Sequence, residues 1–206
     1  MSLPHNIHPD LDHHRLSIVA DVARSVWRTS NRDRNIVLGD TGWSFGACFY
    51  DRTRTALKDA SLEHSWLRII EPRLYFVFTI GEVPIRFYRG DAEKPKKRYF
   101  RRSKREQDQH QIAFAKTWAK QSDWIYRLAV EASFGSDAPT IKLVQHSIST
   151  HLAGEHWEIG IRGTISNGVL PSLQNVFHFQ KDAKFIPPPS LDVFEAHGEH
   201  DEKANG

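Results

Sequence analysis

Cysteine is almost absent from this chain. The 206 residues contain one, Cys48, which excludes a disulfide within the chain and favours a reducing compartment, so we expect a cytoplasmic protein. The surrounding string S-F-G-A-C-F-Y predicts that Cys48 is a small buried hydrophobic residue. The first residues also lack the charged and apolar stretches of a secretory signal.

Long apolar runs and known catalytic motifs are missing too. No run approaches the ~20 apolar residues that span a bilayer, so no membrane-spanning segment is expected. The chain has no Gly-x-Ser-x-Gly string, no phosphate-binding Gly-x4-Gly-Lys-Ser/Thr string and no dinucleotide fingerprint, so the sequence predicts no cofactor and leans toward a non-enzymatic protein. Asp40, between Gly39 and Thr41, is interpreted as a helix N-cap.

Apolar and aromatic residues are plentiful by comparison. They make up 39% and 11% of the chain, which is enough for a folded core and argues against a disordered chain. At this length we expect a single α+β domain over residues 1–189. Three consecutive prolines end it, and residues 190–206 are predicted to form a flexible acidic tail.

Hydrophobic periodicity predicts helices first and strands afterwards. Two amphipathic helices are expected to end near residues 28 and 59, the second burying a stripe that includes Trp43 and Ala47. A central helix is predicted over 103–120. The predicted strands are 66–71, 74–80, 83–88, 124–132, 141–148 and 156–162, with a short seventh over 176–179. We therefore expect an α+β fold in which about six or seven antiparallel strands form two meanders.

The strongest charge feature is the segment from Arg86 to Arg105, called the basic segment below. It holds ten Lys or Arg residues and two acids, a net charge of +8, whereas the whole chain carries +3. Such a segment attracts a polyanion, and its two adjacent aromatic residues could stack on exposed bases. The predicted nucleic-acid-binding residues are Arg86, Arg89, Lys96, Lys97, Arg98, Tyr99, Phe100, Arg101, Arg102, Lys104 and Arg105.

The alternative reading of this segment is a solvated loop between a strand and a helix, with Tyr99 and Phe100 tucked into the core. We favour a small soluble regulatory or adaptor protein that contacts an anionic partner, with DNA or RNA preferred over an acidic protein. No helix-turn-helix spacing, zinc-ligand pattern or RNA-recognition string is present, so phosphate contacts without base readout are expected. The oligomeric state stays open.

Two other functions remain as alternatives. One is a metal-dependent nuclease that uses Glu131 or the triplet Asp182-Ala183-Lys184, with His146 and His156 meeting across a hairpin. The other is a protein–protein interaction module that uses exposed aromatic residues and a sheet edge. No metal site is predicted from the twelve histidines.

Overall fold

The structure, a computed structural model, describes residues 3–132, 136 and 138–160. The predicted seventh strand over 176–179, the end of the domain at residue 189 and the acidic tail lie outside these residues. None of the helices in the described part has the length and apolar content to cross a membrane. The helical elements are α1 (Pro4–Ile7), α2 (His13–Arg32), α3 (Gly42–Glu63), η1 (Lys97–Phe100), α4 (Lys104–Ala113), η2 (Ala115–Thr117) and α5 (Trp118–Gln121). The strands are β1 (Leu67–Glu71), β2 (Val77–Ile80), β3 (Val83–Arg89), β4 (Trp124–Glu131), β5 (Thr140–Ser147) and β6 (Ala153–Glu158).

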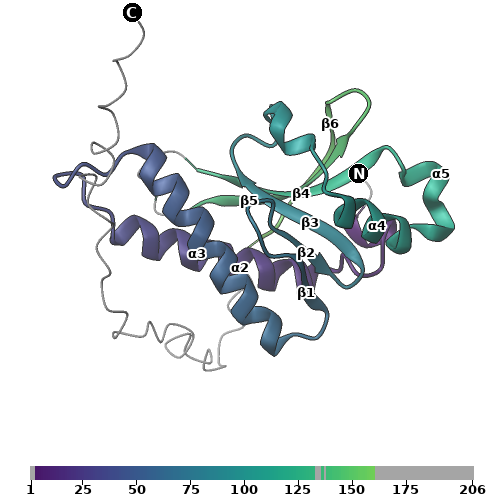
Figure 1. The fold of residues 1–206 in the computed structure, drawn as a ribbon, viewed down its shortest axis with the longest axis horizontal. Helices are drawn as coiled ribbons and strands as arrows, with labels where there is room; N and C mark the ends of the chain where they lie inside the picture. The colour runs from purple at the N-terminus through teal and green to yellow at the C-terminus, as the bar shows by residue number, and fades with distance from the viewer. Residues whose placement is uncertain (1–2, 133–135, 137, 161–206) are drawn as a thin grey trace, which may run out of the picture. The chain divides into compact units, whose positions relative to one another are not determined.

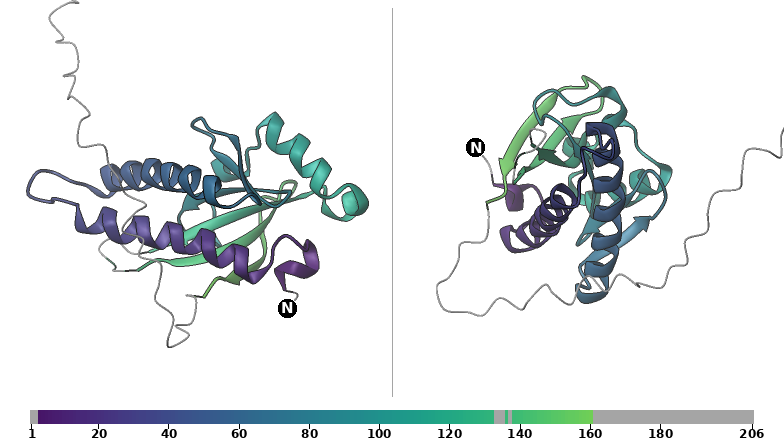
Figure 2. Two further views of the ribbon diagram at one scale, coloured as in Figure 1. Left: turned by 90° about the horizontal axis from the view of Figure 1, so that it is seen from below. Right: turned by 90° about the vertical axis from the view of Figure 1, so that its left-hand side faces the viewer.

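The two long helices, α2 and α3, begin at side-chain caps and run side by side as a hairpin (Figures 1 and 2). The Asp12 side chain accepts a hydrogen bond from the Arg15 backbone N–H at the start of α2. Thr41, rather than Asp40, caps α3, because the Thr41 and Ser44 side chains each accept a hydrogen bond from the other's backbone N–H. The helices predicted near these positions are confirmed, with later ends.

The buried face of α3 differs from the predicted one. Its buried residues include Phe45, Phe49 and Leu57, which recur at helical spacing. Trp43 is 82% exposed, and Ala47 and Cys48 are exposed as well. The predictions of a buried Cys48 and of a buried stripe through Trp43 and Ala47 are therefore wrong, because Trp43 and Ala47 lie across the helix from Phe45 and Cys48 lies on the flank of the buried stripe.

The six strands form one sheet in chain order, and one of its pairs is parallel. β1, β2 and β3 pair antiparallel, as do β4, β5 and β6, so both predicted meanders are present. The junction of β3 with β4 is parallel, which corrects the prediction of a purely antiparallel sheet. The two strands run in the same direction because residues 90–123 form a crossover connection. This connection carries the chain from the end of β3 back to the edge of the sheet at which β3 begins, and β4 starts there. The predicted central helix is three shorter pieces, α4, η2 and α5.

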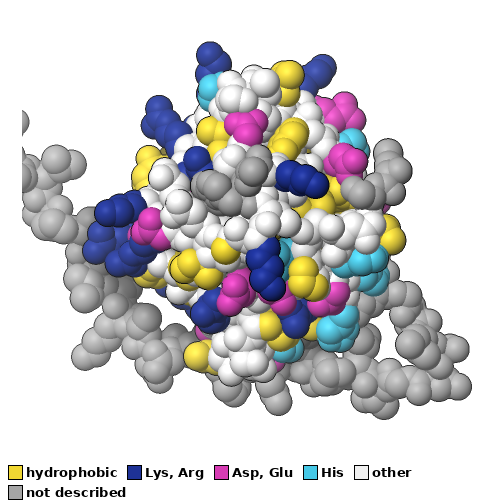
Figure 3. All heavy atoms as spheres, turned by 90° about the vertical axis from the view of Figure 1, so that its right-hand side faces the viewer, with side chains coloured by type: hydrophobic (Ala, Val, Ile, Leu, Met, Phe, Trp, Pro, Cys, Tyr) yellow, Lys and Arg dark blue, Asp and Glu magenta, His cyan; other side chains and the backbone are white. Residues whose placement is uncertain are grey.

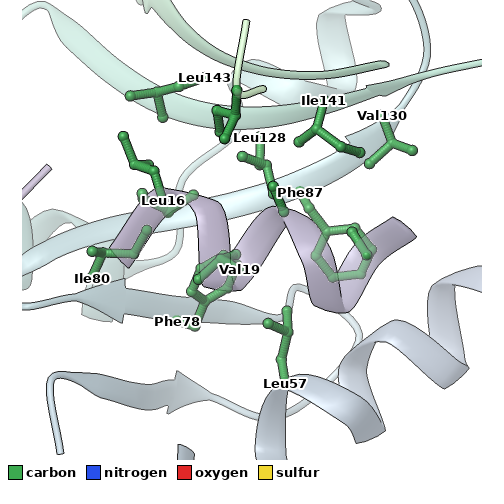
Figure 4. Packing of buried hydrophobic residues seen from close by; sticks show 14 of the residues in the cluster. Leu16, Val19, Leu57, Phe78, Ile80, Phe87, Leu128, Val130, Ile141 and Leu143 are labelled. Carbon is green, nitrogen blue, oxygen red and sulfur yellow. The ribbon is translucent and has the colours of Figure 1, made fainter. Parts of the chain in front are cut away.

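The main core lies between the long helices and one face of the sheet. Figure 4 shows Leu16 and Val19 of α2 close to Ile80 and Phe78 of β2, with Phe87 of β3 and Leu128 of β4 in the same cluster. The neighbouring residues Tyr88 and Ala129 point to the opposite face, because successive side chains of a strand alternate. They form a second, smaller apolar cluster with Ala92 and Val144. Both faces of the sheet are therefore covered, and the basic segment covers part of the second.

Candidate nucleic-acid interface

The basic segment leaves the end of β3 and crosses the face of the sheet that α2 and α3 do not cover. Figure 1 shows η1 on this side, away from the two long helices. The aromatic residues of η1 fix it there. The Tyr99 ring stacks on Tyr88 of β3 with centroids 4.2 Å apart, and the Tyr99 hydroxyl donates a hydrogen bond to the Arg89 carbonyl over 3.2 Å.

Phe100 is the deeper of the two aromatic residues. It is 5% exposed, and its ring lies edge-on to His146 and His151 at centroid distances of 5.2 and 5.1 Å. Its ring is thus covered by protein, and only Tyr99 keeps a partly exposed ring. Tyr99 and Phe100 therefore attach the segment to the sheet. The alternative interpretation of the segment, a solvated loop, also placed these two residues against the core.

Two arginines on adjacent strands hold the backbone of the segment. Arg127 of β4 donates from Nε to the Tyr99 carbonyl over 2.9 Å, and Arg86 of β3 donates to the Arg101 carbonyl over 2.6 Å. Arg86 and Arg127 are register partners in the parallel pair. Burial, with the charge of Arg127 beside it, lowers the pKa of Arg86. Arg86 is therefore an anchor for the segment more than an exposed phosphate ligand.

A carboxylate beneath the segment compensates these charges. Glu106 of α4 accepts from Arg127 over 2.5 Å, and the two side chains are 2% and 1% exposed. The Glu106 Oε2 and Arg127 Nη2 atoms are also buried, with no hydrogen-bond partner among the described residues. Sequence reasoning missed both residues. The available signal was a lone arginine within the apolar strand W-I-Y-R-L-A-V, which implies a buried partner.

Most of the remaining cations of the segment are exposed, although Arg98 also donates to the Tyr99 hydroxyl over 3.1 Å and lies over the Tyr99 ring. Among the described residues, no carboxylate pairs with Lys96, Lys97, Arg98, Arg101 or Lys104, and all five are exposed. Arg105 is exposed as well and lies 3.8 Å from Glu71. Figure 3, which views the end of the molecule that carries α4, shows Lys and Arg side chains spread over this face with one group at its left, and most of the histidines toward the lower right.

The other two predicted cations are less available. Arg89 donates to the Gly42 carbonyl over 3.0 Å and lies over the Phe45 ring. A Cβ atom at Gly46 would lie 3.3 Å from the Arg89 guanidinium, so the glycine makes room for this contact. Arg102 is half-buried, and burial lowers its pKa while the charge of Glu106 acts in the opposite direction.

The residues of the nuclease alternative that the structure describes do not come together. His156 lies opposite Val144 in the sheet rather than opposite His146. Glu131 accepts the Ala92 N–H over 2.6 Å and pairs with Lys142 over 2.8 Å. No group of three His, Cys, Asp or Glu residues suited to a metal ion occurs in the described part of the chain. The triplet from Asp182 to Lys184 lies outside it.

An open hollow of about 950 Å³ adjoins the basic segment at the carboxyl ends of β3 and β4. Ligands of sheets with parallel strands often bind at such ends. The hollow is lined by three cations, Arg89, Lys96 and Lys142, and by three acids, of which Glu131 is one. Because these charges balance, the lining of the hollow has no net charge that would favour a polyanion.

Comparison of the chain with models of protein families, with curated proteins and with solved structures found no match. A function for this chain therefore has to be argued from its own side chains.

Proposed function

We propose that this protein binds nucleic acid through the exposed cations of the basic segment, in a regulatory or adaptor role. One observation supports this most. Cations with no acidic partner among the described residues project from a backbone that Arg86, Arg127 and Tyr99 hold against the sheet. A flexible basic loop would lose conformational entropy when it binds, whereas an anchored one loses less.

The proposed mechanism is neutralisation of phosphate charge. Each Lys or Arg that contacts a phosphate releases counterions, so affinity falls with salt in proportion to the number of contacts. Phe100 is covered, and the half-buried Tyr99 lies against Tyr88, so base stacking contributes little. Binding is therefore expected to discriminate weakly between sequences.

The test is a salt titration of binding to short single-stranded and double-stranded DNA and RNA. The parent should lose about a hundredfold or more in affinity between about 50 and 200 mM salt. A variant with Lys96→Gln, Lys97→Gln, Arg98→Gln and Arg101→Gln should bind weakly. The slope of log affinity against log salt should flatten by about 0.9 for each phosphate contact removed from a DNA duplex.

The matched control removes the same charge from exposed sites elsewhere. Lys58, Arg73, Lys116 and Lys120 are exposed and lie outside the basic segment. Their replacement by Gln should leave most of the affinity intact. Equal losses in both variants would mean that only net charge matters, and a parent that binds no nucleic acid at low salt would move the search to an acidic protein partner.

A further inference from the structure

The turn between α2 and α3 presents apolar side chains to solvent. Ile36, Val37 and Leu38 are 62%, 95% and 83% exposed, and Trp43 is 82% exposed. We call these four residues the apolar tip. The described residues include ten exposed large hydrophobic side chains, so this short stretch holds four of them. Such a concentration on a surface indicates a contact with another molecule or with a membrane.

The turn is held in one conformation by its own polar groups. Asp40 accepts the Asn35 N–H over 2.7 Å, and the Asn35 side chain accepts the Leu38 N–H over 3.1 Å. The Gly39 N–H bonds to the Ile36 carbonyl over 3.0 Å, and Gly39 has a φ of +94° that favours glycine. Several backbone donors are thus satisfied inside the turn. These bonds lower the number of backbone donors that must stay hydrated when the turn enters a poorly hydrated environment.

The apolar tip projects from the fold. Figures 1 and 2 show the α2–α3 turn at one end of the helical hairpin, extending past the strands. Behind it the hairpin is packed firmly, because Trp27 and Phe45 meet edge to face at 4.8 Å. Trp43 points outward while Phe45, two residues later, points into the core. The four side chains of the apolar tip therefore form a convex projection on a well-packed base. A projection of this shape can contact a flat surface.

Positive charge lies just behind the tip. Arg28 and Arg32 occupy one face of α2, one turn apart, and both are exposed. Asp33 forms ion pairs with Arg32 at 3.4 Å and with Arg52 at 3.1 Å, so its negative charge is already neutralised. Asp40, inside the turn, accepts hydrogen bonds from Asn35 and Ser44, so Arg28, Arg32 and Arg52 outnumber the two carboxylates Asp33 and Asp40 near the tip. Arginines behind an apolar projection are complementary to anionic headgroups above a hydrocarbon layer.

We propose that the apolar tip inserts into the surface of an anionic lipid bilayer. Ile36, Val37 and Leu38 enter the boundary of the acyl chains. Trp43 lies at the interface, where aromatic residues are favoured. Arg28 and Arg32 contact lipid phosphates. The proposed lipid contact uses none of the four cations replaced in the basic-segment variant, although the segment reaches the base of the tip, where Arg89 donates to the Gly42 carbonyl beside Trp43.

The experiment is co-sedimentation of the full chain with vesicles of phosphatidylcholine containing about 30% phosphatidylserine, an anionic lipid. The variant Ile36→Ser, Val37→Ser, Leu38→Ser should lose about tenfold or more in partitioning, because it removes the inserted apolar surface. The matched control, Leu62→Ser, Ile112→Ser, Leu152→Ser, changes three other exposed residues and should partition like the parent. Near-ultraviolet circular dichroism should confirm that both variants are folded.

Cys48 gives a second readout that does not depend on affinity. It is the single cysteine, it is exposed, and it lies on α3 near the tip. A polarity-sensitive dye on Cys48 should shift to shorter wavelength with vesicles. The same dye on the variant Cys48→Ala, Leu152→Cys should not shift.

Three results would overturn the proposal. One is a parent that does not bind these vesicles. Another is binding that is lost in the basic-segment variant but kept in the tip variant, which would assign lipid binding to the basic segment. The third is a concentration-dependent dimer that the tip variant abolishes in the absence of vesicle binding. That result would make the tip a contact between two copies of the chain.

Discussion

Arg127 and Glu106 pair over 2.5 Å between β4 and α4, with both side chains almost wholly buried. The pair lies directly under the basic segment, because Arg127 also donates to the Tyr99 carbonyl. A buried ion pair is costly to desolvate, and losing one partner leaves a buried charge uncompensated. This pair therefore ties the stability of the fold to the placement of the segment.

Removing the charge of Glu106 should destabilise the protein strongly. We expect Glu106→Gln to lower the free energy of unfolding by about 3 kcal/mol or more, measured by urea denaturation. The control is Glu63→Gln, at an exposed position, which should change stability by less than about 0.5 kcal/mol. Replacing both partners with apolar residues, as Glu106→Leu with Arg127→Met, should recover much of the loss. Similar midpoints for Glu106→Gln and Glu63→Gln would contradict the assignment.

Truncation of Phe100 should loosen the basic segment without changing its charge. Phe→Ala in a core costs about 3–5 kcal/mol, and Phe100 is 5% exposed against two histidine rings. We therefore expect Phe100→Ala to lower stability in that range. If the proposed function holds, nucleic-acid affinity should fall severalfold while its salt slope stays unchanged, because the cations remain. The control is Trp43→Ala, at a site that is 82% exposed. An unchanged stability for Phe100→Ala would show that the segment is not attached through this ring.

Acid should destabilise the fold through two buried histidines. Burial, with the charges of nearby arginines, lowers the pKa of His110 and of His146 to about 4 from an ordinary 6.5. Between about pH 4 and 6.5 the unfolded chain binds protons at these histidines that the folded protein does not bind. The contribution of these histidines to the free energy of unfolding is therefore fully present above about pH 6.5 and falls as the pH drops toward 4. Each histidine contributes a slope of up to about 1.4 kcal/mol per pH unit.

Substituting one of these histidines should reduce that dependence. Denaturant unfolding of His146→Gln between about pH 4 and 7 should show a shallower loss of stability on acidification, by the share of one histidine. His5→Gln, at an exposed position, should keep the parent slope. Identical slopes in the parent and in both variants would assign the acid sensitivity to other groups.

A methyl group at Gly81 should be poorly tolerated. Gly81 has a φ of +58°, and a Cβ atom there would lie 2.0 Å from Cγ of Asp10. Asp10 accepts the Glu82 N–H over 3.0 Å and pairs with Arg15, so it is not free to move aside. We expect Gly81→Ala to cost about 2 kcal/mol or more in urea denaturation. Gly160→Ala, where a Cβ atom would meet no atom of the described residues within 4 Å, is the control, and equal midpoints for the two variants would refute the clash.

Much of the secondary structure could be predicted because its signals are local. Runs of β-branched and aromatic residues with turns between them indicated both meanders, and polar residues ahead of apolar periodicity indicated α2 and α3. The parallel pairing of β3 with β4 could not be predicted. An alternating pattern of apolar residues indicates which side chains of a strand are buried, but not which strand pairs with it or in which direction. The same limit explains Trp43, whose aromatic character suggested burial although it lies on the solvent side of α3.

The basic segment shows the same limit at the candidate site. Its charge is visible in the sequence, and Lys96 and Lys97 are exposed as the charge pattern suggested. The roles of Arg86 and Phe100 depend on contacts with β4 and β5, which are distant in sequence. Long-range pairing of this kind leaves no periodic signal.

The parallel junction of β3 and β4 also shapes how the chain reaches its fold. Each meander closes through short connections, so its strands can find one another quickly. Joining the halves requires closure of the much longer stretch from residue 90 to 123, which carries a larger entropic cost. We expect two hairpin-rich halves to form early and to merge in the rate-limiting step. Lengthening this stretch with a flexible insert should then slow refolding while leaving the unfolding rate nearly unchanged.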